Sequence, residues 1–227
     1  FGTFPVSKDI DIGGNILHNG VTSNTLAAFI LVAGDVKPEF YMRTTPDERI
    51  QSFDALVTDS DGLLIKEINH TSVRNYLTSI GFKIDPNDPN SIIEYRHTLV
   101  RIGTTGSAYT LGIIQFTPEG YIVVASHVPT GSNISFTTVD DKGIIETAAD
   151  LISKSTQDPN KTLICYSCML RRLTIIDAFA EIEVVLNQAG SSNYHFSYSG
   201  GEICPVMSEE GIYVNKYHNL TLIACLL

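Results

Sequence analysis

The sequence has no long apolar run, little positive charge and only four cysteines, and each shortage excludes a class of protein. No segment approaches the roughly 20 apolar residues that a membrane-spanning helix needs, so we expect no membrane span. The 15 Lys and Arg residues are outnumbered by 25 Asp and Glu, for a formal net charge of −10. Because nucleic acids and anionic membranes are bound by clustered positive charge, we expect no nucleic-acid partner.

The cysteines do not frame the chain as a disulfide scaffold would. Cys165 and Cys168 lie close together at a predicted strand end, and neither Cys204 nor Cys225 has a Cys or His two to four residues away. A structural zinc site needs a second ligand pair at such a spacing, so we predict no metal and no cofactor. A reduced, cytoplasmic protein fits this cysteine usage best.

What the chain does contain is a globular composition, 43% apolar and 18% charged, in which strand patterns give way to helix patterns. A short helix is predicted over 73–80, between an N-cap at Ser72 and Gly81, and a loop over 85–90. The runs that predict strands are 25–32, 39–42, 55–58, 63–68, 94–102, 108–116, 121–126, 133–137, 163–166, 194–198, 202–206 and 220–226.

Two further helices are predicted from apolar residues at helical spacing. Ile144, Ala148 and Ile152 share one face of the first, which Asp140 or Asp141 would cap. The second would run through Ile175, Phe179, Ile182 and Leu186 and end before Gly190. We therefore expect an α+β fold with mixed, largely antiparallel sheets and two or three amphipathic helices packed outside them.

Polar and reactive residues gather in three motifs of the last third. Residues 165–172 read Cys-Tyr-Ser-Cys-Met-Leu-Arg-Arg, 199–205 read Ser-Gly-Gly-Glu-Ile-Cys-Pro, and 217–221 read Tyr-His-Asn-Leu-Thr. In this order, with acidic helical stretches before and between them, they resemble the C-terminal half of the FIST domain, a family regarded as intracellular ligand sensors coupled to signalling modules. The resemblance covers residues 59–227, and residues 1–58 resemble the tail of the FIST N-terminal region.

The resemblance implies a small ligand, an amino acid or a related metabolite, and an effector domain in the full-length protein. The chain begins without Met and stops inside a strand-like segment, so we expect a piece of a longer protein. The candidate ligand-binding residues are Ser167, Cys168, Arg171, Arg172, Gly201, Glu202, His218 and Asn219.

Arg171 and Arg172 follow a strand and open a helix, where unpaired backbone N–H groups favour anions. A guanidinium matches a carboxylate bidentately, and Ser167 or Thr174 could add a hydroxyl. Alternatively, one arginine pairs with a buried carboxylate such as Glu202 and the other is solvated.

Glu202 follows two glycines that let the backbone approach another group. It could take a ligand ammonium, or it could be the buried partner of an arginine. His218 and Asn219 precede the last strand, where such side chains tie a turn to nearby backbone, so a structural lock is favoured there.

Two rival functions remain open from the sequence. One is a protein interaction module that uses a sheet edge or an apolar patch. The other is a thiol enzyme in which His195 or His218 activates Cys168. Buried cysteine is usually inert, and the resemblance implies no covalent catalysis, so we predict a non-catalytic sensor without catalytic residues.

Overall fold

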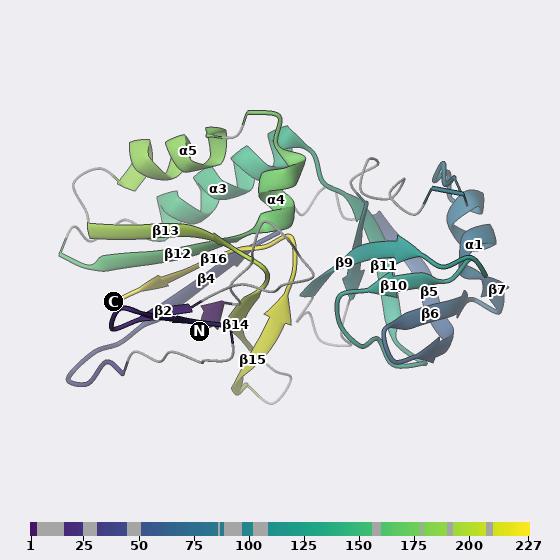
Figure 1. Ribbon diagram of the computed structural model, residues 1–227, viewed down its shortest axis with the longest axis horizontal. Helices are drawn as coiled ribbons and strands as arrows, with labels where there is room; N and C mark the ends of the chain where they lie inside the picture. The colour runs from purple at the N-terminus through teal and green to yellow at the C-terminus, as the bar shows by residue number, and fades with distance from the viewer. Residues whose placement is uncertain are drawn as a thin grey trace.

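The computed structural model describes residues 1–3, 16–24, 31–44, 51–85, 87–88, 97–101, 109–155, 160–177, 179–189, 193–207 and 211–227. Within them the predicted α+β fold is confirmed, with mostly antiparallel sheets and four helices. Most of the strand predicted over 25–32 lies outside the described residues. Figure 1 shows a barrel lobe, built from the described residues of 51–138, beside a layered lobe, built from the described residues of 139–227 with the strands Gly2–Thr3 and Glu39–Arg43.

The barrel lobe is a sheet whose two edges meet. Its strands follow the order β10-β9-β8-β11-β5-β6, and a further antiparallel pairing of β10 with β6 closes the ring. Closure removes the free edges that an open sheet exposes. The elements are β5 (Gln51–Asp61), β6 (Leu64–Ile68), β7 (Thr71–Ser72), α1 (Val73–Ser79), β8 (His97–Arg101), β9 (Tyr109–Phe116), β10 (Ile122–Val124) and β11 (Asn133–Thr138).

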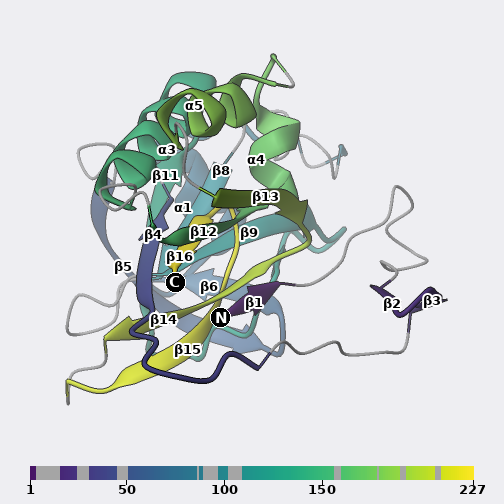
Figure 2. The ribbon, with the colours of Figure 1, turned by 90° about the vertical axis from the view of Figure 1, so that its left-hand side faces the viewer.

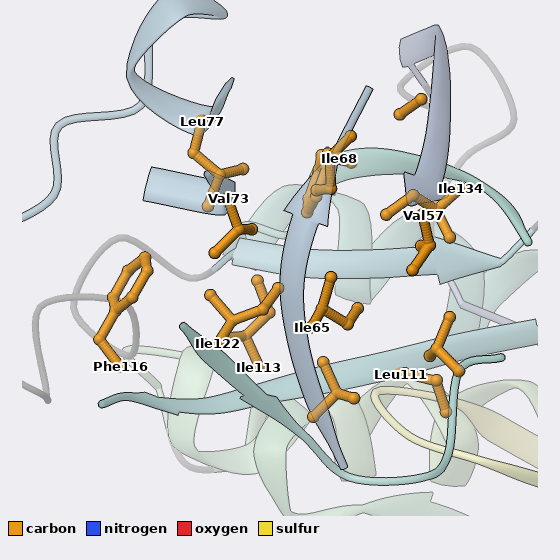
Figure 3. Packing of buried hydrophobic residues seen from close by; sticks show 14 residues of the cluster. Val57, Ile65, Ile68, Val73, Leu77, Leu111, Ile113, Phe116, Ile122 and Ile134 are labelled. Carbon is orange, nitrogen blue, oxygen red and sulfur yellow. The ribbon is translucent and has the colours of Figure 1, made fainter. Parts of the chain in front are cut away.

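Apolar side chains fill the barrel lobe because they alternate along its strands. Ile122 and Val124 on β10, and Ile134 and Phe136 on β11, point inward with one residue between them, as the pleat of a strand requires. Helix α1 adds Val73 to the same core (Figure 3). Each fully buried side chain of this kind stabilises the fold by about 1.5–3 kcal/mol.

The layered lobe stacks helices, a four-stranded sheet and a three-stranded sheet (Figures 1 and 2). The four-stranded sheet has the order β13-β12-β16-β4; β12 and β13 are parallel and the other pairs antiparallel. Helices α3 and α5 cover one face, and the sheet β1-β14-β15 lies against the other. The elements are β1 (Gly2–Thr3), β4 (Glu39–Arg43), α3 (Asp141–Ser155), β12 (Thr162–Cys168), α4 (Met169–Thr174), α5 (Ala180–Ala189), β13 (Asn193–Ser199), β14 (Glu202–Met207), β15 (Tyr213–His218) and β16 (Leu222–Leu226). A separate hairpin joins β2 (Ile16–His18) to β3 (Val21–Ser23).

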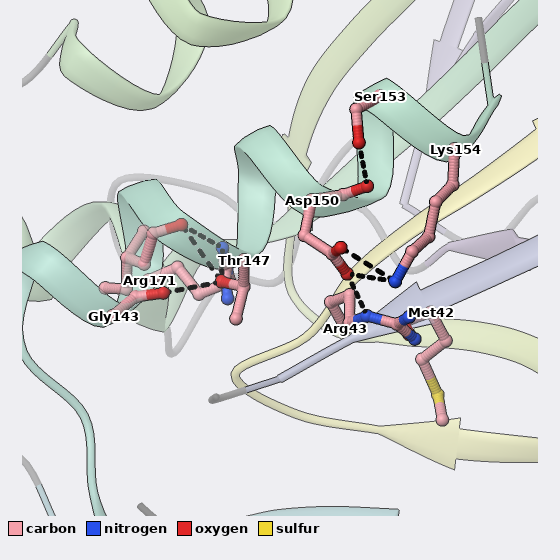
Figure 4. A network of polar contacts seen from close by, with 9 residues as sticks. Met42, Arg43, Gly143, Thr147, Asp150, Ser153, Lys154 and Arg171 are labelled. Atoms are coloured by element: carbon pink, nitrogen blue, oxygen red, sulfur yellow. Dashed lines mark hydrogen bonds and ion pairs between the residues drawn. The ribbon is translucent and has the colours of Figure 1, made fainter. Parts of the chain in front are cut away.

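Helix α3 forms as predicted, with an acidic cap and an apolar face. The Gly143 N–H donates to Asp140 Oδ1 at 2.8 Å, which satisfies a backbone donor at the start of the helix. Ala148 and Ile152 pack on Leu163 of β12 and on β16. On its outer side, Asp150 accepts from Arg43 of β4 at 2.6 Å and pairs with Lys154 at 2.7 Å, which ties the helix to the sheet (Figure 4).

The helix predicted through Ile175 to Leu186 is confirmed from Ala180 to its end before Gly190, but its first part and its buried face are wrong. The chain forms the six-residue α4, becomes extended at Ile175 and starts α5 at Ala180. Phe179 is 65% exposed and Leu186 41%, because the buried face of α5 carries Glu181 and Val185 instead. Because a carboxylate lies on the buried face of α5, the search for apolar spacing chose the wrong face of this helix.

Strand β15 was not predicted, although it pairs with the whole of β14. Residues 213–216 are exposed, so they lack the alternation of a half-buried strand. Among the helices described, none is both long enough and apolar enough to cross a membrane. The predicted division of the chain at residue 58 stays a prediction.

Candidate functional site

Strand pairing brings the sequence motifs together at one end of the layered lobe. On the parallel pair β12 and β13, Ser167 lies beside Tyr198, and Cys168 lies beside Ser199. Because successive side chains of a strand point to opposite faces, the motifs divide into two groups. One group faces the helices, and the other faces β14 and β15.

The helix side holds a buried ion pair. Arg171 Nε donates to Glu181 Oε1 at 2.9 Å, and Nη2 lies 2.8 Å from the same oxygen. The Arg171 guanidinium also donates to Thr147 Oγ1 at 3.1 Å (Figure 4) and to the carbonyls of Thr44 and Ile144 at 2.9 and 3.0 Å. Both charged side chains are fully buried, so loss of either would leave the other buried and unpaired.

The buried partner of Arg171 is therefore Glu181, and not Glu202 as the alternative interpretation of the sequence suggested. Ser167 Oγ donates to Glu181 Oε2 at 2.9 Å, and Thr174 Oγ1 donates to the Leu170 carbonyl at 2.8 Å. Both hydroxyl protons that the sequence offered to a ligand are thus used inside the protein.

Arg172 is less buried than its neighbour and lies near Tyr198 of β13. Burial, together with the charge and hydrogen bonding of Glu181, raises the pKa of the Tyr198 phenol, while Arg172 and Arg171 act to lower it. Arg172 is therefore the arginine of the pair whose guanidinium is open to further contacts.

The other side of the sheet end holds Cys168, Ser199, Glu202 and His218, which we call the polar cluster. Glu202 is fully buried, and its Oε1 accepts from Ser199 Oγ at 2.6 Å. Its Oε2 has no partner of ordinary hydrogen-bond geometry in the described part of the chain, although the Cys168 thiol, a weak donor, acts on the carboxyl. Burial raises the pKa of Glu202 to about 8, against the opposing effects of Ser199, Arg171 and Cys168.

His218 lies directly opposite Glu202 on the antiparallel pair of β14 and β15. Its Nε2 is 3.4 Å from the Cys204 carbonyl, so we assign the ring proton to Nε2. Nδ1 is then an acceptor, and it is buried without a partner among the described residues. Burial lowers the pKa of His218 to about 4, so the imidazole is neutral at pH 7.

Gly201 and Asn219 form a tight junction next to the polar cluster. A Cβ atom at Gly201 would lie 2.3 Å from Tyr217 Oη, so only glycine fits there. Asn219 Nδ2 donates to the same Oη at 3.1 Å. The backbone N–H of Asn219 donates to Thr110 of β9 at 2.9 Å, and its Oδ1 accepts from the Gly112 N–H at 3.3 Å. Asn219 therefore joins the polar cluster to the barrel lobe.

The thiol of Cys168 is protonated at neutral pH. Burial, and then the charge of Glu202, raise its pKa to about 12, which outweighs the backbone hydrogen bonds that lower it. A nucleophilic thiol needs the thiolate, so this environment disfavours the thiol-enzyme alternative. No group of three or more His, Cys, Asp and Glu side chains in the described ranges is arranged to hold a metal ion.

Sequence reasoning missed two residues of this region, Glu181 and Tyr198, and gave no role to Tyr217, although Tyr217 opens the third motif. Glu181 carried a usable signal, because an acidic residue beside a break in apolar spacing can mark a polar position on a buried helix face. Tyr198 carried none, since only the pairing of β13 with β12 places its side chain near Glu181 and Arg172.

A family model described as the FIST C domain matches residues 72–205, more than half of the chain. The matched range contains Ser167, Cys168, Arg171, Gly201 and Glu202 and ends before β15. No curated protein and no solved structure matches the chain at a significant level.

Proposed function

This chain belongs to the FIST C domain family, which is regarded as sensory, and we propose that it binds a small ligand at the polar cluster and passes the bound state to an effector domain. The two atoms that carry the proposal are Glu202 Oε2 and His218 Nδ1, both buried without an ordinary partner in the described residues. A buried polar atom left unpaired costs about 1–3 kcal/mol, and native proteins leave few of them. A ligand that pairs with both atoms removes that cost.

An amino acid or a related metabolite is the ligand class that we propose. Its ammonium would bind Glu202, while Cys168, Gly201, His218 and Asn219 line the site. Arg172 lies near Tyr198 on the helix side of the sheet, so we give it no contact with the ammonium site. Ser167 and Arg171 already bond to Glu181. They are therefore positioning residues that hold the end of β12 and the start of α4 in place.

The proposed route from the site to the rest of the protein runs through Asn219. It is bonded to Tyr217 beside the polar cluster and to Thr110 and Gly112 of the barrel lobe. A ligand changes this junction only if it binds one arrangement of it more tightly than another.

A thermal-shift screen of amino acids and small organic acids tests the proposal. A ligand at 100 times its dissociation constant stabilises the folded state by about 2.7 kcal/mol. We expect a shift in the wild type and in Glu183→Gln, an exposed glutamate on α5 that serves as the matched control. The shift should be lost in Glu202→Gln. A flat screen on folded protein, or an equal shift in both variants, would contradict the proposal.

A protein interaction module is the second candidate, favoured by exposed apolar residues beside α4. Leu173, Ile176 and Phe179 are 64%, 82% and 65% exposed. If this patch binds a partner protein, the Ile176→Ser, Phe179→Ser variant loses the partner, whereas Ile212→Ser, an exposed control on the layered lobe, keeps it. Together with a flat ligand screen, that result would favour the interaction module over the sensor.

A further inference from the structure

Glu202 and His218 form a matched pair of hydrogen-bonding groups within the polar cluster. They are directly opposite on β14 and β15, and opposite residues of an antiparallel pair place their Cβ atoms about 4.5–5.5 Å apart on one face. Both side chains are fully buried, and Oε2 and Nδ1 are the atoms left without ordinary partners. The described residues have three other such atoms, Tyr198 Oη of β13 and, in the barrel lobe, Arg74 Nε of α1 and Ser135 Oγ of β11, and strand pairing joins none of these three to another.

The groups around Glu202 leave its charge without a dedicated counter-ion. Ser199 donates to Oε1, and the Cys168 thiol of β12 faces it as a protonated group. Arg171 of α4 is the cation that reaches it, but that guanidinium is bound to Glu181 of α5, whose negative charge opposes ionisation of Glu202.

The groups around His218 keep its imidazole neutral. The ring of Tyr109 on β9 packs edge-on against the imidazole, with the two ring centroids 6.5 Å apart. Cys204 of β14 holds Nε2 through its carbonyl, and the positive charge of Lys216 on β15 disfavours protonation of the ring. His218 Nδ1 is therefore a neutral acceptor beside a carboxyl that lacks a cation.

We propose that Glu202 holds a proton in the empty site and exchanges it for a small organic cation that donates hydrogen bonds, of which a primary ammonium is the simplest. The carboxyl releases its proton to solvent as the cation enters, so the charge of the site is conserved, and the cation donates to the Glu202 carboxylate and to His218 Nδ1. The inference rests on the proposed placement of the ligand at the polar cluster. It makes occupancy of the site depend on pH.

The proton exchange fixes how binding changes with pH. Because one proton is released per cation bound, the affinity should rise about tenfold per pH unit while Glu202 is protonated in the empty site. The rise should level off above the pKa of Glu202, which burial raises to about 8. A neutral ligand that only accepts a hydrogen bond from protonated Glu202 would show the opposite trend.

Carbon-13 NMR of the glutamate carboxyl carbons tests the exchange, with methylammonium chloride as the probe. In sodium chloride, we expect one carboxyl signal with a titration midpoint near pH 8 in the wild type, and its absence in Glu202→Gln identifies it. If that variant does not fold, Glu202→Asp identifies the signal as well, because it removes the same glutamate carbon. At equal ionic strength, methylammonium should lower the midpoint by about one unit or more.

A Glu202 signal that titrates in the range of surface glutamates, or a midpoint that methylammonium leaves unchanged, would overturn the inference. These outcomes are distinct from failure of the proposed function. If an amino acid stabilises the wild type but the Glu202 midpoint does not move, the sensor stands and the exchange fails. If methylammonium moves the midpoint while the amino-acid screen is flat, the exchange stands and the proposed amino-acid ligand fails.

Discussion

The two lobes differ in the kind of polar side chain that they bury. In the barrel lobe the buried polar residues that the structure describes are hydroxyls, namely Thr110, Ser132, Ser135 and Thr137. In the layered lobe they include Arg171, Glu181, Glu202 and His218, each fully buried. A buried ionisable group costs far more than a buried hydroxyl unless it is paired.

This difference assigns different roles to the lobes. The described barrel interior is filled mainly by apolar side chains with a few hydroxyls, as expected of a scaffold. The layered lobe holds one satisfied ion pair on the helix side of its sheet and an incompletely paired cluster on the other side. Groups with strongly shifted pKa values gather at functional sites more often than elsewhere, so the polar cluster is the region where function is expected.

The largest expected effect comes from breaking the satisfied ion pair. Arg171→Met leaves Glu181 buried without its cation, and the free energy of unfolding should fall by about 3–5 kcal/mol in urea denaturation. Arg172→Met, the adjacent and less buried control, should change it by less than about 1 kcal/mol. Equal losses in both variants would show that the pair does not set the layered lobe apart.

A cavity in the barrel lobe should lower stability without touching the site. Ile65→Ala removes a fully buried side chain and should cost about 2–5 kcal/mol, against less than about 1 kcal/mol for the half-exposed Leu63→Ala. The Glu202 titration should be unchanged in both, because Ile65 lies in the core of the other lobe. A shifted Glu202 midpoint in Ile65→Ala would mean that the barrel core tunes the site.

The polar cluster should also give the stability of the protein a distinctive pH dependence. Folding raises the pKa of Glu202 from 4.5 to about 8, so its contribution to stability is lost as the pH rises through this window. Folding lowers the pKa of His218 from 6.5 to about 4, so its contribution is lost as the pH falls through that window. Each proton amounts to a slope of at most about 1.4 kcal/mol per pH unit.

Two variants separate these contributions in urea titrations. Between pH 6.5 and 8 the wild type should lose stability relative to Glu202→Gln. Between pH 6.5 and 4 it should lose stability relative to His218→Gln. If the stability of a variant depends on pH in the same way as that of the wild type, the substituted residue does not contribute to the pH dependence.

The smallest expected effect concerns the close contact beside the site. Gly201→Ala places a Cβ atom 2.3 Å from Tyr217 Oη, and relief of this overlap should cost about 1–3 kcal/mol. The matched control is Gly2→Ala, where nothing lies within 4 Å of the new atom. If neither substitution changes the thermal unfolding temperature, the Tyr217 side chain moves aside at little cost. The contact at Tyr217 would then be too soft to pass a change at the polar cluster to the barrel lobe.

Local patterns in the sequence predict most of the fold. Alternating apolar residues correctly predicted the strands on either side of the Thr117–Gly120 turn. In this turn the Gly120 N–H donates to the Thr117 carbonyl. Asp140, as a capping residue, correctly predicted the start of α3. These features depend on neighbours in the chain, which a sequence shows directly.

What the sequence missed depends on residues far apart in the chain. Closure of the barrel needs Ile122 to meet Ile65, and no local pattern encodes that register. Glu181 was missed because its partner Arg171 lies across a break between two helices. For the site, the motifs predicted which residues lie close together. They did not predict that Arg171 pairs with Glu181 or that Glu202 is incompletely paired.

The most direct test of ligand binding at the polar cluster is a backbone-amide NMR titration with a ligand that stabilises the protein in the screen. We expect the largest chemical-shift changes in residues 167–168, 199–204 and 217–219, smaller changes at the Thr110 and Gly112 junction, and none in the rest of the barrel lobe. Changes confined to the barrel lobe, or to the exposed Leu173 to Phe179 patch, would contradict the account.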